Sequence, residues 1–160
     1  MAKTKKHNLY TGRSGQLAVM SIFLNWGFNA AIPEVDVGED IFVVRDADGD
    51  LSRIQVKSAI GQGTNRRYAH YGVPLAQLQK PHQPGLFYVF AIHYDDLWRD
   101  FVVIGRQDLD GLRVNQGIGW LNQHNTLMLR LSFGPADVIC QGHNLQPHRN
   151  AWHHWPVIQH

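Results

Sequence analysis

The sequence predicts an α/β fold with a mixed central β-sheet, helices on its flanks and a less regular C-terminal third. Three observations support this prediction: a segment of helical period near the N-terminus, two alternating runs joined by a turn, and a nearly continuous apolar run farther on. A chain of 160 residues that is 44% hydrophobic can bury a core of this size without covalent cross-links.

The first element is a helix over residues 17–28. Leu17, Met20 and Leu24 recur at helical spacing and would face the core, and neighbouring apolar residues widen that face. Ser14 suits the N-cap, and Gly27 suits the C′ position that ends a helix. An extended segment over residues 30–33 would then lead into the sheet.

Two strands joined by a hairpin follow, over residues 39–44 and 54–58. The turn, residues 46–50, contains an Asp-Gly pair between alternating runs, which is a strong hairpin signal. Its aspartates also suggest calcium, but the full loop and terminal Glu of an EF-hand are missing.

This hairpin would bring three polar side chains together. Gln55 and Lys57 are two residues apart on a strand, so they share one face, and the hairpin places Asp40 beside them. An acid, an amide oxygen and an ammonium there could hold a divalent cation next to a phosphate. The alternative is a surface hairpin whose polar side chains face water.

A glycine-rich loop is expected over residues 59–72. It contains Arg66, Arg67 and Tyr68. Guanidinium groups suit phosphate and aromatic faces suit exposed bases, so the loop is a candidate contact for nucleic acid. A solvated, flexible loop is the alternative.

The remaining elements complete the α/β pattern. The run at 85–93 is almost entirely apolar, as expected for a central strand covered on both faces. The other expected elements are a short helix over 74–80 with proline in its first turn, a polar turn over 94–100, a strand over 101–105, a short helix over 107–112, and a half-buried strand over 127–133.

A cluster of possible metal ligands lies near the C-terminus. It comprises Cys140, His143, His148, His153 and His154. Imidazole and thiolate suit zinc, but the spacing matches no common zinc signature beyond one Cys-x-x-His interval. An aromatic-rich tail that packs on the core or on a partner subunit is the stronger interpretation.

Composition narrows the class of protein. The chain has no apolar run long enough to cross a membrane and no secretion signal, and its single cysteine excludes an internal disulfide. We therefore expect a cytoplasmic protein without membrane contact. A net charge of +2 permits nucleic-acid binding without arguing for it.

The order of these motifs resembles the PD-(D/E)XK nuclease superfamily, particularly its resolvase-like and Mrr-like branches. The family pattern is a helix with an acid near its start, then Gly-x-Asp opening a strand, then an acid or glutamine followed by x-Lys. Gly38-Glu39-Asp40 matches the second step and Gln55-Val56-Lys57 the third, in its glutamine variant. Residues 12–58 carry the resemblance. Gln16 stands where the family often has Glu.

The resemblance implies a restriction-endonuclease-like fold and Mg²⁺- or Mn²⁺-dependent cleavage of DNA. Asp40 would hold the metal, aided by the Gln55 side-chain oxygen and the Val56 carbonyl. Lys57 would orient the attacking water, and Gln16 would position water or substrate. With neutral glutamines at two matched positions, metal affinity should be low.

Three domain regions and three functions are expected. Residues 1–8 would form a basic tail, 9–135 the nuclease-like domain, and 136–160 a Trp/His-rich tail. Arg13 joins the arginines of the glycine-rich loop as a candidate phosphate contact. The leading function is a DNA nuclease, for which a homodimer would be the simplest way to cut both strands. The alternatives are a catalytically degenerate subunit that binds nucleic acid or a protein partner, and a plain protein-interaction domain.

Overall fold

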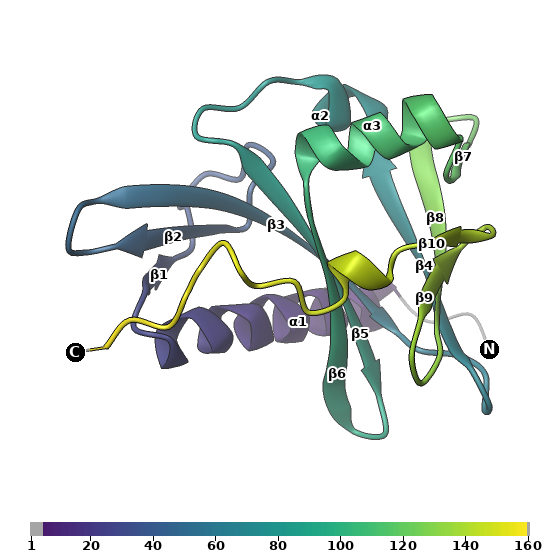
Figure 1. Cartoon of the computed structure of the whole chain (residues 1–160), viewed down its shortest axis with the longest axis horizontal. Helices are drawn as coiled ribbons and strands as arrows, with labels where there is room; N and C mark the ends of the chain where they lie inside the picture. Colours follow the sequence, from purple (N-terminus) through teal and green to yellow (C-terminus); the bar gives the residue numbers. More distant parts are fainter. Residues whose placement is uncertain (1–4, 160) are drawn as a thin grey trace.

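Two β-sheets pack against each other, and a long helix covers the outer face of the first (Figure 1). The computed structural model describes the backbone of residues 5–159 and the side chains of residues 7–159. The α/β fold class with a mixed sheet and flanking helices is confirmed, and the second sheet adds a layer that the sequence did not predict. No helix within residues 5–159 is long and apolar enough to cross a bilayer.

Helix α1 (Lys5–Asn25) begins well before the expected start. The predicted N-cap, Ser14, is wrong: it lies inside the helix, where its hydroxyl accepts a hydrogen bond from Trp98 Nε1 at 3.0 Å. Of the expected tail, residues 1–4 lie outside the described part, and residues 5–8 belong to α1. The C′ prediction is confirmed, because Gly27 has a φ of +85° and Phe28 N donates to Phe23 O at 3.1 Å.

The face that α1 turns to the core differs from the prediction. Val19 and Phe23 are fully buried, whereas Leu17 and Leu24 are about half exposed. Gly15 explains this orientation: a Cβ at Gly15 would lie 2.0 Å from Ser58 Oγ, so only glycine lets α1 approach the sheet this closely. The sequence suggested the wrong face because α1 is apolar on both sides.

The first sheet is mixed, with strand order β1-β2-β3-β5-β6. Its central pair, β3 and β5, is parallel, and the other pairs are antiparallel. Strand β2 pairs with β3 only as far as Ile41↔Ile54, which leaves the second half of β3 open on that edge. The strands are β1 (Asn29–Ala31), β2 (Ile41–Arg45), β3 (Asp50–Ile60), β5 (Leu86–Tyr94) and β6 (Leu97–Gly105).

The second sheet contains residues 67–72 of the predicted glycine-rich loop. Only residues 61–66 connect β3 to β4 (Arg67–Pro74), so the prediction of a loop over 59–72 is wrong. Strand β4 buries Ala69, Tyr71 and Val73 in alternation against the first sheet. It pairs with β8 (Thr126–Phe133), which is flanked by β7 (Trp120–Leu121) and β9 (Val138–Cys140); β10 (His143–Asn144) follows.

Two short helices and a 3₁₀ turn close the layer between the sheets. They are α2 (Leu75–Gln79), α3 (Arg106–Gln116) and η1 (Gln146–His148). The polar turn expected over 94–100 is shorter, because Asp95 and Asp96 adopt positive φ values of 51° and 62° and close a tight hairpin between β5 and β6.

The C-terminal segment packs on α1 and the first sheet. The rings of Trp152 and Trp155 lie 5.8 and 5.1 Å from that of Phe23, at nearly perpendicular angles. Trp155 Nε1 donates to Ser52 Oγ at 3.0 Å, and Ile158 N donates to Trp26 O at 2.9 Å. This segment, drawn in yellow in Figure 1, therefore completes the core around α1.

Candidate active site at the open edge of β3

Asp40 lies immediately before β2, where that strand leaves the edge of β3 open. Its backbone N–H donates to Ile54 O at 2.8 Å, which continues the β2–β3 ladder by one residue. Its carboxylate Oδ2 accepts hydrogen bonds from Val56 N at 2.8 Å and from Gln55 Nε2 at 2.5 Å. Two donors from β3 thus fix the carboxylate over the open edge.

Val56 contributes its backbone to this site. The N–H and C=O of one strand residue project to the same side. Since the Val56 N–H points to Asp40, its carbonyl also projects from the edge that β2 leaves open. A carboxylate and a backbone carbonyl therefore share one edge of the sheet.

Gln55 is held by Gln77, a residue that sequence reasoning missed. Gln77 lies on α2, and its Nε2 donates to Gln55 Oε1 at 3.1 Å and to Gly38 O at 2.5 Å. The Tyr88 hydroxyl donates to Gln77 Oε1 at 3.2 Å. This network turns the Gln55 NH₂ toward Asp40 and its oxygen away. No sequence motif links a residue on α2 to a strand 22 positions earlier.

Lys57 and Asp40 influence each other's ionisation. Burial lowers the pKa of Lys57, and the charges of Asp40 and Asp36 oppose that shift. Burial raises the pKa of Asp40, and the Val56 N–H and the Lys57 ammonium oppose it. Both charged groups therefore occupy a partly desolvated site, where their interaction is stronger than in water.

Gln16 approaches Asp40 from α1, but through the backbone. Its Nε2 donates to Asp40 O at 2.7 Å, and its Oε1 accepts from an Arg13 guanidinium nitrogen at 2.8 Å. Arg13, Gln16, Asp36 and Asp40 line a hollow of about 200 Å³ next to the open edge. The structure thus brings together Asp40, Gln55, Val56, Lys57, Gln16 and Arg13.

The other predicted nucleic-acid contacts lie elsewhere, around the second sheet. Arg66 forms an ion pair with Asp137 at 2.8 Å and also bonds Ser132 on β8. Arg67 pairs with Asp95 at 3.0 Å. The Arg130 guanidinium lies 4.3 Å from the centre of the Tyr68 ring. All three predicted residues thus already have protein partners, and none of those partners belongs to the Asp40 site.

The donors around Asp40 fit a hard divalent cation only in part. Carboxylate and carbonyl oxygens are the ligands that Mg²⁺ and Mn²⁺ prefer, and Asp40 and Val56 supply them. Gln55 presents its Nε2 instead, so it can act as an oxygen ligand only after its amide turns and its bond to Gln77 breaks.

The zinc alternative fails on geometry. Among the described residues, no three His, Cys, Asp or Glu side chains converge. Cys140 is buried in β9 within the inter-sheet core, and burial raises the pKa of its thiol to about 11.

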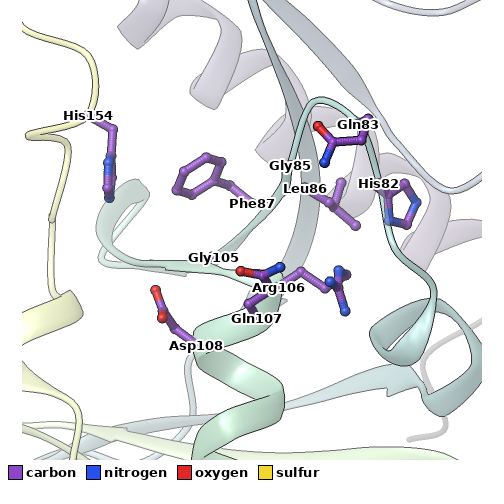
Figure 2. A pocket seen from close by; sticks show the side chains of 10 residues that line it. All are labelled: His82, Gln83, Gly85, Leu86, Phe87, Gly105, Arg106, Gln107, Asp108 and His154. Atoms are coloured by element: carbon purple, nitrogen blue, oxygen red, sulfur yellow. The ribbon is translucent and has the colours of Figure 1, made fainter.

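A separate hollow of about 310 Å³ lies where β5 begins, β6 ends and α3 starts (Figure 2). Arg106, Asp108 and His154 line it, together with Phe87, whose ring lies 4.9 Å from that of His154. The Arg106 guanidinium already has a partner within the protein, since it donates to Leu78 O at 2.6 Å. Of the residues predicted from the sequence, the candidate zinc ligand His154 lines this hollow, and none of those predicted for the Asp40 site or for nucleic-acid contact does.

Comparison with known proteins rests on the fold. No protein-family model matches the sequence, and no curated protein matches it. One solved structure, that of the bacterial homing endonuclease I-Ssp6803I, superposes with a TM-score of 0.52 at 16% identity, over 94% of this chain and 89% of that chain. The chain has an endonuclease-like fold. The likeness covers 94% of the chain and so extends well beyond the motif region, residues 12–58.

Proposed function

We propose that this chain is a metal-dependent nuclease that hydrolyses phosphodiester bonds in DNA, as a glutamine variant of the PD-(D/E)XK superfamily. The arrangement of Asp40 supports this most: its carboxylate is fixed by two β3 donors and lies in one desolvated site with Lys57. The endonuclease-like fold adds support, because a solved structure that shares it is a homing endonuclease.

In this proposal Asp40 and the Val56 carbonyl hold Mg²⁺ or Mn²⁺, and Gln55 joins them when its amide turns. The bound cation supplies an activated water and offsets the charge that builds on the phosphate. Gln77 sets the resting orientation of Gln55 and is therefore a positioning residue. Gln16 holds the Asp40 backbone, so its role is to fix the chain at the site.

Lys57 carries the proton chemistry. Its ammonium faces developing negative charge on the phosphate and donates to it. Because burial lowers the pKa of Lys57, its proton leaves more readily than that of a solvated lysine, which suits a group that orients a nucleophile or passes on a proton.

DNA would meet the site beside Arg13, which lines the same hollow as Asp40. Arg66, Arg67 and Tyr68 would contact the substrate farther out, at the second sheet. Guanidinium groups fix the register of a phosphate backbone but read no sequence. Their present ion pairs are partly exposed and therefore cost little to exchange for phosphate.

One observation favours the catalytically degenerate alternative. The side chains of Gln16 and Gln55 are both engaged in hydrogen bonds with other parts of the protein. Because both glutamines are neutral, the negative charge at the site comes from Asp40 and Asp36. In that case the chain would bind DNA through the same surface without cutting it.

A cleavage assay distinguishes these functions. The purified chain is incubated with supercoiled plasmid, single-stranded DNA and a branched junction, each with Mg²⁺ or Mn²⁺. We expect cleavage by the wild type, none by Asp40→Ala or Lys57→Ala, and nearly unchanged DNA affinity in both variants. DNA binding without cleavage under either ion would establish the degenerate function. Absence of both would refute the proposal.

A further inference from the structure

The outer face of the second sheet stays open to solvent. Strands β4 and β8 bury every second side chain in the core between the sheets, and the residues that alternate with these are half-buried or exposed. The outer side chains are Tyr68 and His70 on β4, and Met128, Arg130 and Ser132 on β8. Trp120 of β7 pairs with Met128 and is 43% exposed. This face therefore presents large side chains that the fold leaves uncovered.

Three of these side chains, Tyr68, His70 and Trp120, form an aromatic row across the face. The His70 ring lies 5.9 Å from that of Tyr68 and 6.4 Å from that of Trp120, at interplanar angles of 89° and 79°. Perpendicular rings do not cover one another's faces as parallel rings would. The spacing is also wider than the roughly 3.4 Å between neighbouring nucleotides on one strand of duplex DNA. The aromatic row therefore suits the bases of an extended, unpaired strand.

Arginines flank the aromatic row. The Arg130 guanidinium lies 4.3 Å from the centre of the Tyr68 ring, and it forms no ion pair with any residue whose side chain the structure describes. Arg66 and Arg130 line a hollow of about 280 Å³, where the Asp137 carboxylate is already paired with Arg66. Arginines beside aromatic rings are the combination that binds the phosphates and bases of a single strand.

A polar hollow joins this face to the candidate active site. Because the Val56 N–H points out from the open edge of β3, Ser58 and Ile60 lie at the same edge, two and four residues farther on. Both line a hollow of about 380 Å³, which Thr11 of α1 and His70 of β4 also line. A DNA strand bound at the candidate active site can therefore follow the open edge of β3 through this hollow to the aromatic row.

We propose that the aromatic row binds the unpaired bases of a DNA strand that runs on to the candidate active site. The bases stack on Trp120 and Tyr68, and Arg130 contacts the phosphates. In a duplex each base is covered by its neighbours, so only an unpaired strand can offer base faces to these rings. Resting on the proposed nuclease function, this names the substrate class: DNA with an unpaired strand beside the bond that is cut.

Fluorescence anisotropy in EDTA tests the binding without metal-dependent cleavage. The probes are a short labelled single strand, the same strand paired with its complement, and a strand of equal length whose sugars carry no bases. Trp120→Leu keeps an apolar side chain but removes the ring. We expect it to weaken binding of the single strand about tenfold, which is within the range for one stacked base, and to leave the affinity for the other two probes unchanged.

Two further variants control this experiment. Leu121 is 47% exposed on the same strand, but its side chain alternates to the other face of the sheet, so Leu121→Ala should not change binding. Trp120→Phe retains a ring and should keep most of the affinity for the single strand. An unchanged affinity in Trp120→Leu, or an equal loss for the strand without bases, would overturn the proposal.

Photocross-linking tests the contact in the wild-type chain, so its result does not depend on how a variant folds. A single strand that contains iodouracil is irradiated in complex with the protein, and mass spectrometry locates the attached peptide. Iodouracil couples to aromatic side chains that stack on it. We expect attachment at Trp120 or Tyr68. Attachment confined to peptides that contain no member of the aromatic row would contradict the proposal.

Cleavage kinetics separate this proposal from the nuclease function. With Mn²⁺, a duplex that carries a single-stranded arm should have a lower KM than a blunt duplex, and Trp120→Leu should raise the KM for the armed duplex without changing kcat. Single-strand binding through the aromatic row without cleavage by any substrate refutes the nuclease function alone. Cleavage with equal KM for both substrates, unchanged in Trp120→Leu, refutes the role of the aromatic row alone.

Discussion

Gln77 is expected to contribute far more to the free energy of unfolding than its place on a short helix suggests. Replacing it with methionine keeps the side-chain length but removes its bonds to Gln55 Oε1, Gly38 O and the Tyr88 hydroxyl. Tyr88 and Gln55 are buried residues, and burial raises the pKa of Tyr88 well above its ordinary value. Their polar atoms would therefore lose partners in a place that water reaches poorly.

The magnitude follows from these three bonds. At about 1 kcal/mol net for each, Gln77→Met should lower the free energy of unfolding by about 3 kcal/mol. For a domain of this size that corresponds to a fall of roughly 6–12 °C in Tm. Urea unfolding at constant m-value measures the first quantity and calorimetry the second.

Two further variants separate the network from general damage. Gln79 is an exposed glutamine on the same helix and provides the control. Gln79→Met should change the free energy of unfolding by no more than about 0.5 kcal/mol. In the double variant Gln77→Met with Tyr88→Phe, both partners of one bond are lost, so its cost should fall short of the sum of the single costs by about 1 kcal/mol. If Gln77→Met is as mild as Gln79→Met, the network does not hold Gln55.

Other expectations concern charge at the site. Because the pKa of Lys57 is lowered in the folded chain, the unfolded chain holds that proton to higher pH. The free energy of unfolding should therefore rise with pH through the titration of Lys57 in the folded chain. Urea unfolding at several pH values should show this rise in the wild type and not in Lys57→Met. Gln16→Glu should lower the Mn²⁺ concentration needed for half-maximal cleavage; an unchanged titration would mean that Gln16 acts only on the backbone. Arg66→Ala with Arg67→Ala should weaken DNA binding and reduce the slope of log affinity against log salt by up to about two units, as fluorescence anisotropy would show.

The local site geometry was predictable from the sequence. The Asp-Gly turn fixes the hairpin, and the two-residue period of β3 puts Gln55 and Lys57 on one face, so Asp40 and Gln55 could be placed together before any coordinates. What could not be predicted is the direction of the Gln55 amide. It depends on Gln77, whose distance along the chain leaves no local pattern.

The larger errors came from patterns that fit two structures. Helix α1 is apolar on two faces, and periodicity could not tell that Gly15 brings Val19 rather than Leu17 to the core. In β4, Ala69 and Gly72 are small and His70 is polar, so the alternation of a half-buried strand resembled a glycine-rich loop. Tertiary packing decided both cases.

The central claim is that a divalent cation binds at Asp40 and the open edge of β3. Iron-directed cleavage of the polypeptide tests this directly: Fe²⁺ with ascorbate and hydrogen peroxide is supplied in place of Mg²⁺, and hydroxyl radicals formed at a bound Fe²⁺ cut the backbone next to it. We predict cuts near residue 40 and residue 56, suppressed by excess Mg²⁺ and absent in Asp40→Asn. Cuts confined to other segments, or an unchanged pattern in Asp40→Asn, would contradict the account.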